Sequence, residues 1–464
     1  MSSIRGAAEA GKASNTATRA QRLALLTLSF QTLGIIYSDI GTSPLYTLNG
    51  IWPASSAVPP EEDVIGGLSA IIWALTLLPL LKYVFICLRF GTMEGEGGTF
   101  ALYQGLYPPK RHVPDDNFVL DPLENEKEAS TTVSFSDPAS GPMPDISPKL
   151  QFPLFVWCLF GTALTLADGI FTPAVSVTSA VAATFVWLIL LAATGIVNII
   201  SYPAVFRAFD PSRAIMLFVR TKNYDILAGV LLALTGCEAM FASLGHFNML
   251  SIQLSFSCFV YPSVVLAYLG QGARLVVDGE TALANLFYAT IPGSPNGPLY
   301  WIMFVFGILA TFIASQTLIT ASFSLIQQLI KMHVLPPLRI VHTSETHYGQ
   351  IYIPAVNWIL MIVTIIVVAT FKDPVKLTNA YGWGFSLSPA VQMKFVKHLH
   401  VLVVLSFFLV FGFLDGLFWG AALKKVPQGA WVPLIIGIIM ITIMLFWSWA
   451  KVSRIPSMVS TVET

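Results

Sequence analysis

Long apolar runs alternate with short polar connections along almost the whole chain of 464 residues. A helix needs about 20 apolar residues to cross the ~30 Å hydrocarbon core of a membrane, and about ten runs reach that length. The runs lack the period-2 alternation of lumen-facing strands, so they predict an all-α polytopic membrane protein. The predicted spans are Leu23 to Leu48, Val64 to Leu88, Phe152 to Ala182, Ala183 to Ile200, Ile226 to Leu244, Leu250 to Leu269, Leu299 to Leu318, Ile351 to Phe371, His400 to Leu423 and Trp431 to Ala450.

The amino-acid composition supports a membrane protein and argues against a nucleic-acid-binding protein. Charged residues make up 11% of the chain, against about 25% in soluble domains, and hydrophobic residues make up 55%. The 25 Lys and Arg residues balance 25 Asp and Glu residues, so nothing attracts nucleic acid. The sequence has no Ser/His/Asp set, metal-ligand spacing or cofactor motif. We therefore expect membrane lipid as a partner, and neither an enzyme nor a bound cofactor.

Polar segments define the expected domain organisation. Residues 1–22 are predicted to form a disordered cytoplasmic tail, and residues 23–104 the first two spans and a cytoplasmic gate motif in which Glu94 and Glu96 lie among glycines. Residues 105–151 are rich in Pro, Ser, Asp and Glu and predict a disordered cytoplasmic loop. Residues 152–451 form the remaining transmembrane core, and residues 452–464 a short C-terminal tail.

The first span is interrupted beside a carboxylate. In IIYSDIGTSPLYTL, Gly41 and Pro44 break the helix next to Asp39. A carboxylate in hydrocarbon costs at least ~2.5 kcal/mol, which makes each one a functional hypothesis. The break predicts a cation cage, and the alternative is a kinked helix whose own turn satisfies Asp39. Hydroxyl oxygens beside freed backbone carbonyls would come from Thr42, Ser43 and Tyr46.

Two later spans repeat this combination of acid and hydroxyl. Asp168 and Thr172 are four residues apart and share a helical face just before a proline. In LALTGCEAMF, Gly236 loosens the helix, and Thr235 and Glu238 are predicted to share a face. The alternative in both spans is a carboxylate that pairs with a neighbouring helix.

Two other charges lie in apolar runs. Lys82 is near the end of its span, where snorkelling to the interface is expected. Asp415 is expected to cap a helix or to pair, in a structural role.

Two Gly/Pro-interrupted helices, one opening each half of the chain, indicate an inverted-repeat transporter with its site near the membrane midplane. Acids that converge there without a cationic partner predict a cation as the ligand.

Six motifs, in order, resemble those of the KUP/HAK/KT family of potassium uptake transporters, and most closely its fungal HAK branch. The motifs are YSDIGTSPLY (37–46), EGEGGTFALY (94–103), LTLADGIFTPAVSV (164–177), LTGCEAMFASLGHF (234–247), ASQTLITASFSLIQQ (314–328) and IYIPAVNWILM (351–361). The resemblance implies a LeuT-like inverted-repeat bundle of the amino acid–polyamine–organocation superfamily, with twelve helices. It also implies uptake of potassium together with a proton across the plasma membrane. The potassium-binding residues that it implies are Asp39, Tyr46, Asp168, Thr172, Thr235 and Glu238.

The chain departs from the family pattern in length. The fourth and tenth helices of the family are missing from the expected positions, as is the C-terminal cytoplasmic domain. Loss of the fourth helix is expected to invert every later span until loss of the tenth restores the original sense. An inverted half would keep Thr235 away from Asp39.

The leading hypothesis is therefore that the chain takes up potassium by proton-coupled symport. The alternatives are a non-transporting degenerate, splice or mispredicted form of a potassium transporter, and a polyamine or amino-acid transporter of the same fold. Dimerisation of the chain stays open.

Overall fold

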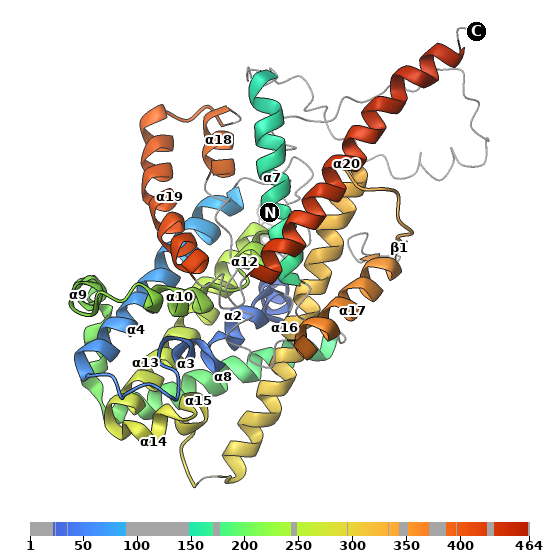
Figure 1. Ribbon diagram of the computed structural model, residues 1–464. Helices are drawn as coiled ribbons and strands as arrows, with labels where there is room; N and C mark the ends of the chain where they lie inside the picture. The colour runs from blue at the N-terminus through green and yellow to red at the C-terminus, as the bar shows by residue number, and fades with distance from the viewer. Residues whose placement is uncertain are drawn as a thin grey trace, which may run out of the picture.

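A computed structural model describes residues 22–23, 25–34, 36–89, 148–169, 177–242, 248–294, 296–332, 334–342, 351–370, 387–395, 397–424 and 431–462 of the protein. The described elements are helices, apart from one antiparallel pair of short strands, β1 (Val341–His342) and β2 (Ile351–Tyr352). The all-α prediction is therefore confirmed. Figure 1 shows the helices as one bundle, with α9 at its left edge and α14 and α15 at the lower left.

The helices follow the predicted runs, and several are interrupted. Residues 25–34 are helical and precede the short helices of the first span. The first half continues with α2 (Ser38–Thr42), η1 (Ser43–Leu45), α3 (Thr47–Ile51), α4 (Glu61–Leu75), η2 (Thr76–Ile86), η3 (Cys87–Arg89), α7 (Pro148–Gly169), α8 (Val177–Ser201), η4 (Pro203–Phe209) and α9 (Pro211–Thr221). The second half contains α10 (Asp225–Leu231), η5 (Leu232–Leu234), α11 (Cys237–Ala242), α12 (Met249–Ser255), η7 (Phe256–Val260), α13 (Tyr261–Asp278), α14 (Glu280–Leu283), α15 (Leu286–Ala289), α16 (Pro298–Lys331), α17 (Pro354–Thr370), α18 (Leu387–Phe395), α19 (Val401–Lys424) and α20 (Trp431–Val462).

Five helices among the described residues are long and apolar enough to cross a membrane. They are Glu61–Arg89, Val181–Ser201, Met249–Asp278, Pro298–Lys331 and Val401–Lys424. Four shorter apolar helices accompany them, namely Phe152–Thr162, Asp225–Leu234, Pro354–Ile366 and Leu434–Ala450. These segments coincide with predicted runs, while the count of about ten spans stays a prediction.

Two predicted boundaries differ from the structure. We expected one span to end at Ala182 and the next to begin at Ala183, but α8 is continuous from Val177 to Ser201. VTSAVAATFVW contains neither glycine nor proline, so nothing in it ends a helix. Similarly, α20 continues past the predicted end at Ala450 to Val462.

The predicted inversion of the later spans is wrong. Loop residue Val58, before α4, lies 3.7 Å from the position of a Cβ on Gly279, just after α13. Tyr202, which directly follows α8, donates a hydrogen bond to Glu61 at the start of α4. The connections that precede α4 and follow α8 and α13 therefore share one end of the bundle, so α8 runs in the same direction as the first span.

Close helix packing explains this orientation. A Cβ on Gly270 of α13 would lie 2.5 Å from the Gly195 Cα of α8, so the two helices touch through their backbones. At the other end of α8, a Cβ on Gly34 would lie 2.7 Å from the Val181 backbone. Contacts this close require glycine and fix α8 against both neighbours, whatever the length of the segment before it.

Candidate functional site

The first span breaks where the sequence predicted. Helix α2 ends at Thr42, η1 contains Pro44, and α3 begins at Thr47. Proline in η1 has no N–H to continue a regular helix, so the backbone changes from α to 3₁₀ geometry and then restarts. Asp39 lies in α2, and Tyr46 lies between η1 and α3.

The second break separates α10 and η5 from α11. Thr235 has extended ψ of 143°, and Gly236 has φ of +85°, which favours glycine. The predicted loosening at Gly236 is confirmed. The prediction that Thr235 and Glu238 share a helical face is wrong, because Thr235 precedes the helix that contains Glu238.

The two helix breaks lie against each other in the structure. A Cβ on Gly236 would lie 2.8 Å from Asp39 Oδ2, so any larger residue would displace the carboxylate. On the same two segments, the Tyr46 Oη and Thr235 Oγ1 atoms are 3.2 Å apart, at hydrogen-bond distance. Asp39, Tyr46 and Thr235, predicted from separate halves of the chain, therefore form one cluster, which we call the break site.

The Asp39 carboxylate is the chemically unusual member of the break site. Its Oδ2 atom is buried, and it has no hydrogen-bond partner among the described residues. A buried ionised carboxylate is costly unless a hydrogen-bond donor or a cation balances its charge. An unpartnered carboxylate oxygen, on segments that also bring two hydroxyl groups together, is a suitable ligand for a hard cation.

Other predicted residues cannot be placed against this cluster. Asp168 lies on the last turn of α7 and Glu238 on the first turn of α11, and for both the structure describes the backbone only. Thr172, Glu94 and Glu96 lie outside the described residues. The roles of these residues stay predictions.

The hydroxyl hydrogens of Thr42 and Ser43 are used within the first break, which leaves their oxygen lone pairs as the predicted ligands. Thr42 donates to the Asp39 carbonyl at 2.8 Å, and Ser43 donates to the Ile40 carbonyl at 2.7 Å. Ser and Thr side chains often bond back to carbonyls three or four residues earlier, and here this satisfies backbone oxygens in the interrupted turn.

Two backbone carbonyls of this turn accept hydrogen bonds from side chains of neighbouring helices. Trp187 Nε1 of α8 donates to the Gly41 carbonyl at 2.9 Å, and Gln271 Nε2 of α13 donates to the Pro44 carbonyl at 2.9 Å. Because the interior offers no bulk water, donors from neighbouring helices satisfy backbone groups that the break leaves exposed.

A buried ion pair lies close to the second break. Lys82 Nζ of η2 is 2.8 Å from Asp415 Oδ1 and 2.6 Å from Asp415 Oδ2 of α19, with side chains 1% and 6% exposed. The snorkelling predicted for Lys82 is wrong, whereas the pairing expected of Asp415 is confirmed. Asp415 also lines a small cavity of about 50 Å³ with Leu234 and Cys237, which flank the second break.

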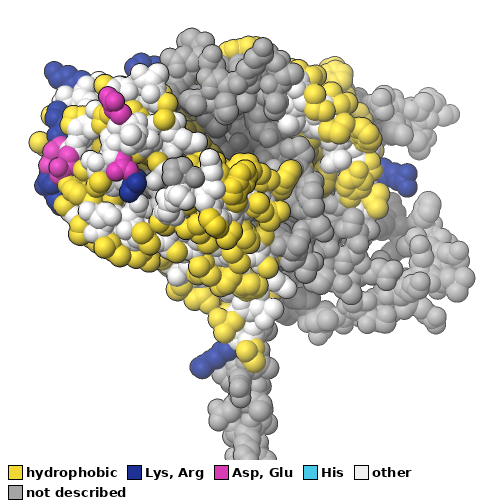
Figure 2. Space-filling view, turned by 90° about the horizontal axis from the view of Figure 1, so that it is seen from below, with side chains coloured by type: hydrophobic (Ala, Val, Ile, Leu, Met, Phe, Trp, Pro, Cys, Tyr) yellow, Lys and Arg dark blue, Asp and Glu magenta, His cyan; other side chains and the backbone are white. Residues whose placement is uncertain are grey.

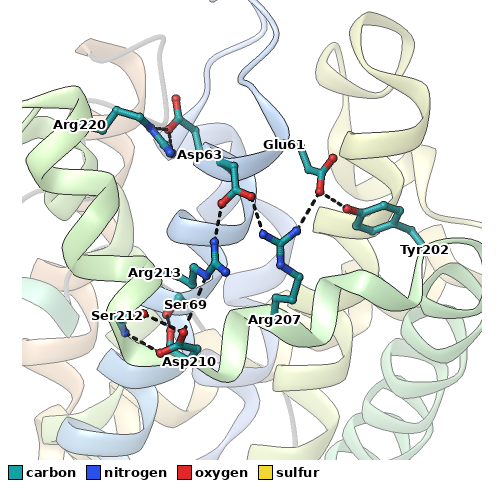
Figure 3. Close-up of polar contacts among 10 residues, drawn as sticks. Glu61, Asp63, Ser69, Tyr202, Arg207, Asp210, Ser212, Arg213 and Arg220 are labelled. Carbon is teal, nitrogen blue, oxygen red and sulfur yellow. Dashed lines mark hydrogen bonds and ion pairs between the residues drawn. The ribbon is translucent and has the colours of Figure 1, made fainter.

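A second group of charges joins α4 to the segment after α8. Glu61, Glu62 and Asp63 begin α4 and pair with arginines of η4 and α9, as Figure 3 shows. The arginines are Arg207, Arg213 and Arg220. Seen from below, charged side chains gather on one side of the molecule (Figure 2). These pairs anchor η4 and α9 to α4.

Hydrogen bonds shift the pKa of Asp210 beside this group. The Ser212 hydroxyl and backbone N–H both donate to the Asp210 carboxylate, at 2.7 and 3.0 Å, and they lower its pKa. The same contacts form the N-terminal cap of α9.

Comparison with known proteins identifies the family. Residues 26–184 and 182–452 match the family described as "K+ potassium transporter integral membrane domain". The two matches meet beside Ala183.

Several relatives match along nearly the whole chain. The high affinity potassium transporter of Schwanniomyces occidentalis is 38% identical over 497 residues, which cover 93% of this chain and 60% of the relative. Putative potassium transporter 12 of Arabidopsis thaliana is 35% identical over 94% of this chain and 58% of its own length. Potassium transporter 1 of Oryza sativa subsp. japonica is 33% identical over 92% and 60%.

The chain spans about three fifths of the length of these relatives. The alignment to the Schwanniomyces occidentalis protein is longer than the 464 residues of this chain, so it contains gaps in this chain. With ordered matches over most of its length and several apolar helices, the chain is a multi-pass membrane protein that belongs to the K+ potassium transporter family.

Proposed function

We propose that the chain carries potassium ions across a membrane through the break site. The observation that supports this most directly is the buried, unpartnered Asp39 oxygen at the meeting point of two interrupted helices. A partly dehydrated cation there would receive carboxylate and hydroxyl oxygens in place of water. The relatives named as potassium transporters supply the identity of the ion.

The complete ligand set that we propose is larger than the described cluster. Asp168, Thr172 and Glu238 would join Asp39, Tyr46 and Thr235, since the sequence motifs that contain them resemble those of the family. Alternating access would come from rocking of one helix bundle around the site in a LeuT-like inverted-repeat fold. Glu94 and Glu96 would belong to a cytoplasmic gate.

We further propose proton-coupled symport at the plasma membrane. Because symport moves both ions in the same direction, the proton and the potassium ion would occupy different carboxylates of the site at the same time. The membrane potential would favour inward movement of both positive charges.

Growth of a potassium-uptake-deficient cell on micromolar potassium tests this function. We expect the chain to restore growth, and Asp39→Asn, Asp168→Asn and Glu238→Gln each to abolish it at unchanged membrane levels. The matched control is Asp225→Asn, because Asp225 pairs with Lys424 at an exposed position away from the breaks. Growth restored by all three site variants would refute the site assignment.

The meeting of the two family matches at residues 182–184, together with the internal gaps in the alignment to the Schwanniomyces occidentalis relative, favours a second candidate, a non-transporting form of a potassium transporter. The same cell expressing a version with the two missing segments restored from the Schwanniomyces occidentalis relative separates the two candidates. Rescue only by the restored version would identify this chain as the non-transporting form.

A further inference from the structure

We propose that Gln271 and Trp187 set the cation selectivity of the break site by holding two backbone carbonyls of the first break. This inference rests on the proposed function, because it concerns the same site. Neither residue is among the predicted ligands, and each lies on a helix different from the break itself.

Gln271, which lies on α13, holds the segment of the first break that follows Asp39. Its side chain is 2% exposed, and its Nε2 atom donates to the Pro44 carbonyl at 2.9 Å. Its Oε1 atom is buried and has no hydrogen-bond partner among the described residues. The amide is therefore oriented by a single bond, with its acceptor oxygen unused.

Tyr268 adds hydrogen-bond contacts between α13 and the same segment of the first break. It lies three residues before Gln271, on the same face of α13. The Tyr268 hydroxyl is 2.8 Å from the Ser43 hydroxyl and donates to the Thr47 hydroxyl at 3.0 Å. The α13 face thus contacts the first break immediately before, at and after Pro44, the position where regular helix bonding is lost.

Trp187, which lies on α8, holds the earlier part of the first break, at Gly41. Its side chain is fully buried, and its Nε1 atom donates to the Gly41 carbonyl at 2.9 Å. The ring packs against Phe287, with 5.7 Å between ring centroids, and this contact restricts its movement. A Cβ on Gly41 would lie 3.3 Å from Leu188 Cδ2, a tight contact to which the leucine side chain would have to adjust slightly.

These contacts fix the geometry of the ligands. Asp39 and Tyr46 lie on either side of the Gly41–Pro44 turn, so a shift of this turn changes the separation of the carboxylate and phenol oxygens. Potassium, rubidium and caesium carry the same charge and differ in radius. Discrimination among them therefore depends on how firmly the ligand oxygens are spaced and oriented. Residues behind the ligands supply that restraint.

A purely structural role predicts a different outcome. If the two side chains only stabilise the fold, their loss reduces the amount of active protein and lowers the apparent binding of every cation in the same proportion. If they set the spacing of the ligands, the ratio of affinities among cations changes. Affinity ratios are independent of how much protein remains folded, and they separate the two roles.

The test measures potassium, rubidium and caesium affinities of the purified full chain by competition against radiolabelled rubidium. Gln271→Met keeps the side-chain length and removes the donor to Pro44, and Trp187→Phe removes the donor to Gly41. The matched control is Trp73→Phe, because Trp73 Nε1 donates to the Phe209 carbonyl at 3.0 Å, where α4 meets η4.

We expect the potassium-to-caesium affinity ratio to change by about tenfold in Gln271→Met, the lower range for residues that orient metal ligands. Trp187→Phe should shift the affinity ratio in the same direction. If Gln271→Met does not fold, the measurement on Trp187→Phe decides the test. The control should leave the ratio within about twofold. Ratios equal to wild type in both variants would overturn the inference while leaving the proposed function intact. Absence of binding in the wild-type chain, or unchanged binding in Asp39→Asn, would overturn both.

Discussion

Removing one partner of the Lys82–Asp415 pair should strongly destabilise the protein. The side chains are 1% and 6% exposed, and their charges are 2.6 Å apart at the closest atoms. At an effective dielectric constant of about 20, two unit charges at this separation attract by roughly 6 kcal/mol, before the cost of desolvation. Asp415→Leu or Lys82→Met leaves the remaining charge buried without its partner, so the expected loss is about 3–5 kcal/mol.

The double variant Lys82→Met/Asp415→Leu should behave differently. It removes both charges and fills the space with apolar groups, and such replacements are often neutral or stabilising by about 1–4 kcal/mol. The double variant should therefore be more stable than either single variant. The coupling between the two positions is the quantity of interest, because it isolates the pair from other effects of each substitution.

The assay is unfolding of the purified chain by SDS in mixed micelles, followed by circular dichroism. Lys424→Ala serves as the control, since Lys424 and Asp225 form a 2.8 Å pair with side chains 55% and 48% exposed. An exposed pair should contribute only about 0–1 kcal/mol. Single variants at Lys82 and Asp415 that cost no more than the control would refute the assignment of a buried ion pair.

Two further predictions concern backbone geometry and pH. Gly236→Ala should cost at least about 1–2 kcal/mol, because φ is +85° and the new Cβ would lie 2.8 Å from Asp39 Oδ2. It should also weaken rubidium binding, and wild-type stability and binding would contradict the geometry of the break site. The Asp210 pKa is lowered by Ser212, so this contact adds stability above the unfolded pKa of about 3.9 and loses it as the pH falls below that value. Ser212→Ala should therefore flatten the loss of stability between pH values of about 5 and 3, measured by unfolding midpoints, and parallel curves would refute the linkage.

Local sequence was sufficient to predict both helix breaks. Gly41 with Pro44, and Gly236 alone, mark positions where regular helix bonding fails, and an acid lies close to each in an apolar run. These signals depend only on neighbouring residues. Asp39, Tyr46 and Thr235 could therefore be identified before their proximity was known.

Partners far apart in the sequence could not be predicted in the same way. Lys82 and Asp415 are 333 residues apart, and only their opposite charges within apolar runs hinted at a pair. The donors Trp187 and Gln271 resemble ordinary core residues, because nothing local shows which carbonyl they reach. Charge position in a span predicted snorkelling for Lys82, but a buried partner decides the outcome.

Two predictions were wrong because they assumed that a regular local pattern continues unchanged along the chain. Counting spans predicted that loss of one helix would invert the rest, but the glycine contact between Gly195 and Gly270 fixes α8 independently of that count. Helical spacing predicted a shared face for Thr235 and Glu238, although the break at Gly236 lies between them. Tertiary packing and the break itself override the simple periodicity in these two places.

Potassium flux into liposomes that contain only this purified chain tests the central claim most directly. Wild-type protein and Asp39→Asn are reconstituted in equal amounts, and flux is measured with an inside-negative membrane potential. We predict potassium entry with the wild-type chain and loss of entry with Asp39→Asn, while Asp225→Asn retains it. Equal flux through wild-type and Asp39→Asn protein, or none through the wild-type chain, would contradict potassium transport through the break site.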